Sequence, residues 1–240
     1  MPGKLKNRPH AATAENPGGH ASEEELHELV LRACLIARDA VFNVRDSLAS
    51  GSRLAFLAIK DCEKELDQIE RKIDDQLPGA ITRVGEAKAR ELLACLKFIT
   101  DLERIGDLAQ SAIMQLQSRR EQLPSADSRQ LIAMAGLLCE MLEQVHQGFR
   151  TRELSYAQSV LKSDPEVDRL CHELFHRHLA APSRGPEKAG APARAQDFDI
   201  LLAAQALERI GDHAKNLAEE IYSLAERRSL RHNTRKLAYS

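Results

Sequence analysis

Four acidic motifs are the features of this 240-residue sequence that most directly suggest chemistry. In each motif two carboxylates stand four positions apart, which places both on one side of an α-helix. The four pairs are Glu63 and Asp67, Glu103 and Asp107, Asp164 and Asp168, and Glu208 and Asp212. Clustered carboxylates repel one another unless a cation compensates their charge. Their oxygens suit hard cations such as Mg²⁺, Ca²⁺, Mn²⁺ or iron, so the chemistry that these motifs suggest is metal binding.

Two of the motifs lie inside an internal repeat. The hexapeptide Leu-Glu-Arg-Ile-Gly-Asp occupies residues 102–107 and recurs unchanged at residues 207–212. A second, weaker similarity lies before each copy: residues 63–67 resemble residues 164–168. A chance hexapeptide match has odds on the order of one in a thousand, so the repeat indicates a duplication. Its long period favours two three-helix bundles over a solenoid, with the acids on the second and third helix of each half.

The apolar pattern places the acids at the edge of each bundle. In the third predicted helix the apolar positions alternate spacings of three and four, which is typical of a bundle seam. Glu103 then falls at heptad position e and Asp107 at position b, and the other pairs follow the same rule. Antiparallel neighbours bring their e positions together along one side, with Glu63 and Glu103 nearly level. We therefore expect two equivalent groups of four carboxylates, one in each half.

Two glycines on the seams have a predicted packing role. Gly106 and Gly211 stand inside predicted helices, where glycine costs about 1 kcal/mol relative to alanine. We expect both to allow a neighbouring helix to approach closely beneath the acids.

The chain around these motifs is predicted to be all-α, with six helices. The expected ranges are about 22–48, 54–77, 86–119, 128–149, 153–179 and 195–228. Ser22 and Glu25 form a capping-box pattern, Gly51 marks a helix end, and the second helix is expected to end before Pro78. Pro165 predicts a kink or a late start of the fifth helix.

These helices are expected to form two pseudo-symmetric antiparallel three-helix bundles. The predicted segments are a mobile N-terminal tail at 1–21, a first bundle at 22–122, a second bundle at 123–228 with a flexible Pro/Gly-rich loop at 181–194, and a basic C-terminal tail at 229–240.

Composition excludes several classes of protein. Hydrophobic residues make up 43% of the chain and aromatic residues only 4%, which favours helices with Leu/Ala seams over a β-sandwich or barrel. A net charge of −2 and few aromatics argue against nucleic-acid binding.

The longest uncharged apolar run, residues 131–139, is too short to span a bilayer. With no apolar signal core at the N-terminus and five widely spaced cysteines, we expect reduced thiols in a cytoplasmic protein.

The paired Leu-Glu-Arg-Ile-Gly-Asp motifs, each with a further acidic motif on the preceding helix, resemble the PhoU family over residues 22–228. The resemblance implies multinuclear metal clusters, held by paired E(D)xxxD motifs that match the eight acids above. It also implies a non-enzymatic negative regulator of phosphate uptake and of the phosphate-starvation response. Its implied partners are the phosphate ABC transporter ATPase and the phosphate sensor histidine kinase, with contact to the membrane only through partner proteins. Homo-oligomerisation is left open.

The alternatives begin with surface roles for the acids. They could form a solvated face in which Glu103 and Glu208 pair with Arg104 and Arg209. The chain would then be a metal-free helical scaffold with a charged docking surface.

Two enzymatic alternatives rest on other patterns. Residues 172–176 match the H-E-x-x-H signature of zinc proteases, but the heptad register places His172 and His176 on the solvated side. A carboxylate-bridged di-metal oxidoreductase needs Glu-x-x-His pairs, and Gly106 and Gly211 stand where those histidines would be.

Overall fold

The structure is a computed structural model that describes residues 22–117, 123–179 and 191–238. Within these ranges the chain is built of α-helices without a strand, which confirms the predicted all-α class. The helices are α1 (Glu23–Ser50), α2 (Arg53–Ile81), α3 (Glu86–Leu116), α4 (Ser125–Thr151), α5 (Leu154–Leu179) and α6 (Ala191–Ala238). The predicted tail at 1–21 and residues 181–190 of the predicted loop lie outside the described residues, whereas residues 191–194 of that loop are helical.

Local sequence signals fix the start and end of α1. The Ser22 side chain accepts a hydrogen bond from the backbone N–H of Glu25, and the Glu25 carboxylate accepts one from the backbone N–H of Ser22. This is the predicted capping box. Gly51 ends the helix in the left-handed conformation at φ 82°, which glycine adopts without steric cost. Ser52 then caps α2 by accepting from the N–H of Ala55.

Two helices continue through prolines that were expected to interrupt them. Pro78 lies in the last turns of α2, so the prediction that this helix ends before it is wrong. A proline there removes one backbone hydrogen bond, and burial of Leu77 and Ala80 against the core favours continuing the helix. The fifth helix begins at Leu154 and includes Pro165, so the predicted late start is also wrong.

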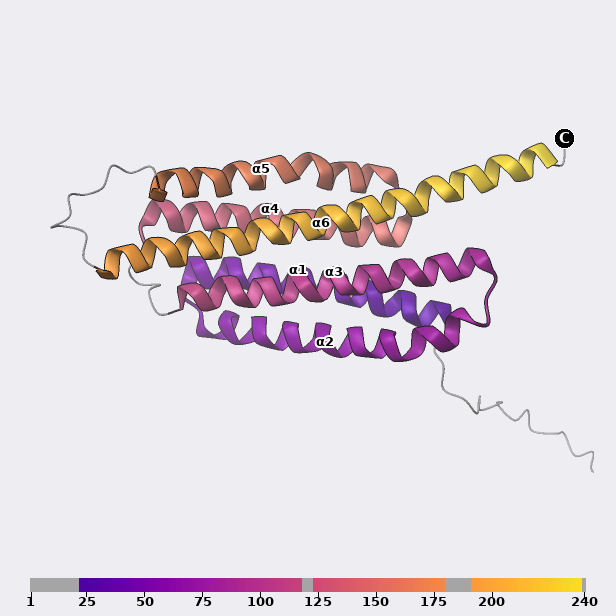
Figure 1. The fold of residues 1–240 in the computed structure, drawn as a ribbon, viewed down its shortest axis with the longest axis horizontal. Helices are drawn as coiled ribbons and strands as arrows, with labels where there is room; N and C mark the ends of the chain where they lie inside the picture. Colours follow the sequence, from indigo (N-terminus) through magenta and orange to yellow (C-terminus); the bar gives the residue numbers. More distant parts are fainter. Residues whose placement is uncertain (1–21, 118–122, 180–190, 239–240) are drawn as a thin grey trace, which may run out of the picture.

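The last helix is longer than the sequence pattern indicated. We expected about 195–228, whereas α6 spans Ala191–Ala238. Pro192 falls in its first turn, where a missing N–H costs no intrahelical bond. The segment assigned to a basic tail continues the helix, and this end of α6 projects beyond the other helices (Figure 1).

The six helices form two three-helix groups that pack side by side (Figure 1). One group is α1–α3 and the other is α4–α6. Helix α1 contacts α4 and α3 contacts α6, while α2 and α5 lie on the outer sides. Buried apolar side chains from all six helices belong to one continuous core. Polar contacts also cross the junction: Arg38 of α1 donates to Glu143 of α4 at 2.6 Å, and Asp101 of α3 lies 2.8 Å from His213 Nδ1 of α6.

The two seam glycines occupy equivalent places with different clearances. A Cβ atom on Gly106 would lie 2.7 Å from Leu66 Cδ1 of α2, so the predicted close approach is confirmed there. A Cβ on Gly211 would meet Val167 of α5 at 3.5 Å, which is ordinary van der Waals contact. Close helix packing therefore requires a glycine at the first position only.

Candidate metal centres

The first group of acids lies along one edge of the antiparallel pair α2 and α3. Burial raises the pKa of Glu103, and the neighbouring carboxylates of Asp107, Glu70 and Asp67 raise it further. The side chain of Glu103 is 18% exposed, whereas that of Asp107 is 45% exposed. These carboxylates are thus close enough to repel one another at the bundle edge, three of the predicted four together with Glu70. A cation placed among them would relieve this repulsion.

Glu63, the fourth predicted member, lies further along the edge. A Cβ on Gly106 would be 3.6 Å from Glu63 Cα, so Glu63 lies opposite that glycine. Its Oε2 accepts a hydrogen bond from Gln110 Nε2 at 3.4 Å. Antiparallel packing therefore aligns Glu63 with the turn that follows Glu103.

Arginines also reach the first group. Arg71 lies 2.8 Å from Asp67 along α2, and Arg104 lies 3.6 Å from Glu103 and 3.8 Å from Asp107 along α3. The anticipated ion pairing of Glu103 with Arg104 is therefore present. Both arginine side chains are largely exposed, at 74% and 59%, and exposed ion pairs of this kind stabilise a fold little.

The second group brings its four predicted acids together between α5 and α6. Burial raises the pKa of Glu208, and Asp212, Asp168 and Asp164 raise it further. Burial also raises the pKa of Asp168, with Asp164 and Asp212 as the next causes. The pKa of Glu208 therefore reflects all three other members, and that of Asp168 reflects Asp164 and Asp212.

Asp164 is the buried member of the second group. It is only 4% exposed, and its Oδ2 accepts a hydrogen bond from Lys215 Nζ of α6 at 2.8 Å. Its Oδ1 is buried and has no hydrogen-bond partner among the described residues. A buried carboxylate oxygen left in this way is costly, and a cation would compensate it.

The acids share an electrostatic neighbourhood without forming a preassembled coordination sphere. Among the residues that the structure describes, no three His, Cys, Asp or Glu side chains are grouped closely enough to hold a metal ion. The donor chemistry fits a hard cation in both groups, since the acids supply oxygen ligands and repel one another. The predicted set of eight ligands stays a prediction.

Sequence reasoning missed four further residues at the two edges. They are Glu70 and Gln110 in the first half, and Cys171 and Lys215 in the second. Each stands seven residues after a predicted acid at heptad position e. It therefore occupies the next position e, two helical turns further along the same edge. In the second half burial raises the pKa of the Cys171 thiol to about 11, with Glu208 and Asp168 contributing. The signal that could have found these residues was the continuation of the heptad stripe.

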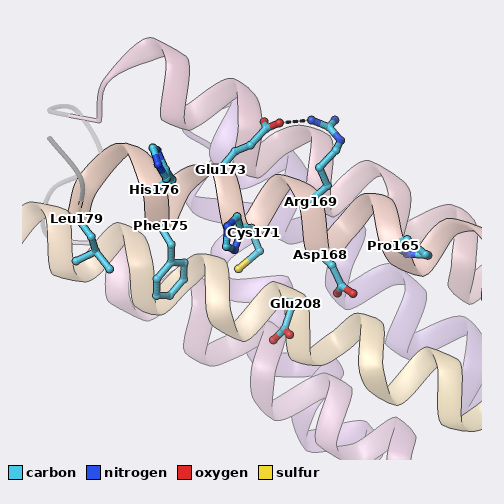
Figure 2. Close-up of a pocket in the computed structure, with 10 residues that line it drawn as sticks. Pro165, Asp168, Arg169, Cys171, Glu173, Phe175, His176, Leu179 and Glu208 are labelled. Atoms are coloured by element: carbon cyan, nitrogen blue, oxygen red, sulfur yellow. Dashed lines mark hydrogen bonds and ion pairs between the residues drawn. The ribbon is translucent and has the colours of Figure 1, made fainter.

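The H-E-x-x-H match lies beside the second group, on the outside of α5. His172 and His176 are exposed and line an open cavity of about 1050 Å³ that also contacts Asp168 and Glu208. Figure 2 shows Glu173 turned toward Arg169, on the side of α5 away from α6. The Glu173 carboxylate thus forms an ion pair with Arg169, and both histidines are solvated as the heptad register predicted.

The positions at which a di-metal oxidoreductase would need histidines are occupied by glycines that pack against the neighbouring helix. Gly106 and Gly211 stand three positions after Glu103 and Glu208, against Leu66 and Val167. Asp164 alone among the eight predicted acids is buried, and the other seven are half-buried or exposed at the bundle edges. None of the helices, as far as the structure describes them, is long and apolar enough to cross a bilayer.

Comparison with known proteins matches both halves of the chain. The PhoU domain model matches residues 30–116 and 131–221. The "Phosphate-specific transport system accessory protein PhoU homolog" of Rhizobium meliloti (strain 1021) is 29% identical over 212 residues, which is 85% of this chain and 87% of that protein. The homologue of the same name from Caulobacter vibrioides is 30% identical over 206 residues, covering 83% and 87%.

Solved structures show the same fold. The crystal structure of PhoU from Pseudomonas aeruginosa aligns with a TM-score of 0.74 at 22% identity, over 85% of this chain and 96% of that one. The phosphate transport system regulatory protein PhoU from Streptococcus pneumoniae aligns with a TM-score of 0.71 at 20% identity, over 84% and 94%. With the domain model matched in each half, the chain belongs to the PhoU family.

Proposed function

We propose that this protein is a non-enzymatic regulator of phosphate homeostasis, which restrains phosphate uptake and the phosphate-starvation response through protein contacts. The observation that carries the proposal is the PhoU domain model matching residues 30–116 and 131–221. The relatives from Rhizobium meliloti and Caulobacter vibrioides are named as accessory proteins of phosphate-specific transport. Both span nearly the same length as this chain, which supports a shared role for the whole molecule.

The proposed partners are the ATPase of the phosphate ABC transporter and the phosphate sensor histidine kinase, at the cytoplasmic side of the membrane. An all-helical molecule with two similar halves offers two related faces, which suits a protein that bridges two partners. Nucleic acid is not among the proposed partners, because the net charge of −2 gives no overall attraction to a polyanion.

Metal ions are the proposed cofactors, as clusters of divalent ions or iron at the two acidic edges. The proposed ligands are the eight predicted acids, with Glu70 added in the first half. The raised pKa of Glu103 and of Glu208, with burial and then neighbouring carboxylates as its causes, supports a cation at each edge. The buried Asp164 Oδ1, which lacks a hydrogen-bond partner among the described residues, supports it further. When bound, such an ion supplies positive charge and links the two helices that carry its ligands.

The regulatory role is tested by recovery of partners. Tagged full-length protein would be purified from cells grown in phosphate-rich and phosphate-poor medium, and the co-purified proteins identified by mass spectrometry. We expect the transporter ATPase or the histidine kinase in at least one condition. Recovery of neither, with the tagged protein shown to restore regulation in a deletion strain, would contradict the proposal.

The metal role is tested separately by elemental analysis of purified protein. We expect bound metal in the wild type and its loss when Glu103, Asp107, Glu208 and Asp212 are replaced by alanine. Glu219→Ala, an exposed acid on α6, is the control for a change of charge alone. Unchanged metal content in the fourfold variant would assign any bound metal to other residues.

A metal-free scaffold is the second candidate, and one observation favours it. Arg71 and Arg104 already lie against three carboxylates of the first group, so side-chain cations alone neutralise part of its charge. In that case wild-type protein would contain no metal, and charge-reversing substitutions at Arg71 would weaken partner recovery.

A further inference from the structure

The two acidic edges are equivalent by the repeat, but one equivalent position carries a different charge. Gln110 of α3 corresponds to Lys215 of α6, since each follows its hexapeptide motif at the same spacing. Glu63 of α2 likewise corresponds to Asp164 of α5. The contact between them is preserved: Gln110 Nε2 donates to Glu63 at 3.4 Å, and Lys215 Nζ donates to Asp164 at 2.8 Å. One place in the fold therefore holds a neutral amide in the first half and an ammonium group in the second.

The packing of the glycines confirms that these positions correspond in space. A Cβ on Gly106 would approach both Leu66 and Glu63, and a Cβ on Gly211 would approach Val167 and Asp164 Oδ1. The same pairs of positions meet beneath both edges. The difference in charge is therefore a difference within one geometry.

Lys215 is well placed to act as the counter-ion of the second group. Its ammonium contacts the most buried of the four carboxylates, and Asp168 and Asp212 lie within electrostatic range of it. Asp164 is 5% exposed in its side chain, so water screens this ion pair weakly. The Lys215 side chain itself is 42% exposed, so removing its ammonium destabilises the fold chiefly by leaving the buried charge of Asp164 uncompensated.

The arginines of the first half do not neutralise a buried carboxylate as Lys215 does in the second half. Arg104 corresponds to Arg209 in the second half, so it does not distinguish the two edges. Arg71 contacts Asp67 from an exposed position on the same helix, where the pair is open to solvent. The first group thus has the neutral Gln110 on Glu63 and only exposed arginines on its other acids.

We infer that Lys215 is a built-in cation of the second acidic edge, so that the two edges are inequivalent metal sites and the first is filled preferentially. This inference rests on the proposed metal binding. A metal ion entering the second edge has to displace the ammonium from the buried Asp164. At the first edge it has to replace the amide hydrogen bond of Gln110 and the solvent-exposed ion pairs of Arg71 and Arg104, which stabilise little. Like charges in one site disfavour each other, so affinity at the second edge is lowered.

The test is a titration of full-length protein with Mn²⁺ alone, following the electron paramagnetic resonance signal of the free ion. We expect binding in two steps, with the tighter step abolished by the double variant Glu103→Gln and Asp107→Asn. Lys215→Gln, which copies the first half, should tighten the weaker step by about tenfold. Gln110→Lys, which copies the second half, should weaken the tighter step. Lys162→Gln, an exposed lysine on α5, controls for net charge.

A readout without metal accompanies the titration. In EDTA, Lys215→Gln should lower the melting temperature, and adding Asp164→Asn should restore part of it because the buried charge is removed. Equal filling of both edges in the wild type, or an unchanged second step in Lys215→Gln, would overturn the inference while leaving the proposed metal binding intact. Absence of Mn²⁺ binding in the wild type and in Lys215→Gln alike would overturn both. If Lys215→Gln fails to fold, Gln110→Lys still tests the inference at the first edge, because an unchanged tighter step in that variant would overturn it.

Discussion

Gly106 of α3 lies so close to Leu66 of α2 that a Cβ atom at Gly106 would come within 2.7 Å of Leu66 Cδ1. Leu66 is fully buried, so its side chain has to shift within the core to admit a methyl group. At the equivalent Gly211 a methyl group would make ordinary contacts, with Val167 Cγ1 nearest at 3.5 Å. Two glycines in identical hexapeptides thus have different structural constraints.

The first prediction follows from this difference. Gly211→Ala should stabilise the protein by about 0.5–1 kcal/mol, because alanine favours the helix and fits the site. Gly106→Ala should destabilise it by about 1 kcal/mol, because overpacking outweighs the gain in helix propensity. Urea unfolding of both variants measures the free energies. A stabilising Gly106→Ala would show that the α2–α3 contact can relax.

The second prediction concerns Glu103, whose charge destabilises the metal-free fold but would bind a cation. Burial raises the pKa of Glu103, and Asp107, Glu70 and Asp67 raise it further, so its charge is unfavourable in the metal-free fold. In EDTA near pH 7, Glu103→Gln should therefore raise the free energy of unfolding by a fraction of a kcal/mol, and the melting temperature slightly with it. With Mn²⁺ added, the same variant should gain less stability than the wild type.

The control for that experiment is Glu219→Gln, an exposed acid on α6. Its effect should be small and of the same size with and without Mn²⁺. If Glu103→Gln responded to Mn²⁺ as fully as the wild type, Glu103 would not be a ligand. Thermal unfolding followed by circular dichroism supplies all of these values.

The sequence predicted most of the fold because two independent patterns agreed. The heptad seam set the phase of each helix, and the repeat set the correspondence between the halves. Helix ends were less predictable where packing decided them: α2 continues past Pro78 because Leu77 and Ala80 are buried, which no local signal reveals. The heptad register of the apolar seam also predicted that the acids lie at the bundle edges.

The contacts within each acidic edge were harder to predict. Glu70 and Lys215 lie one heptad beyond Glu63 and Glu208, so their positions could have been found from the stripe. Whether Lys215 turns toward Asp164 or toward solvent depends on its side-chain conformation and on the depth of its partner. The sequence holds no signal for either, although the contact decides how the second edge is neutralised.

The third prediction concerns the cysteines, all of which are free thiols. Burial raises the pKa of Cys171, Cys62 and Cys139 to about 11 each, and that of Cys95 to about 12. At pH 8 the thiolate fraction of a group near 11 is on the order of 100-fold below that of an ordinary thiol. Alkylation by iodoacetamide should therefore be slow in the native protein and fast in urea.

Peptide mass spectrometry separates the five sites in that reaction. The half-buried Cys62 and Cys139 should be labelled before Cys34, which is fully buried. Labelling of Cys34 at the rate of the half-buried thiols would indicate that the core of the first bundle opens readily.

The fourth prediction concerns the junction of the two bundles at low pH. Hydrogen bonds from Gln147 and Arg38 lower the pKa of Glu143 from 4.5, and the ion pair with Arg38 joins α4 to α1. A carboxyl whose folded pKa is depressed stabilises the fold above its unfolded pKa and loses that contribution as pH falls through the folded pKa. Glu143→Gln should therefore cost about 0.5–1 kcal/mol at pH 7, since the pair is partly exposed, and progressively less below pH 4.5.

Urea unfolding at pH 7 and at pH 3.5 measures this loss. Glu140→Gln, an exposed acid one turn earlier on α4, should change stability little at either pH. An equal cost of Glu143→Gln at both pH values would mean that the amide fails for steric reasons and that the charge of Glu143 contributes nothing. A cost confined to neutral pH would identify the Arg38–Glu143 pair as an electrostatic link between the bundles, one that acid releases without disturbing the apolar core beneath it.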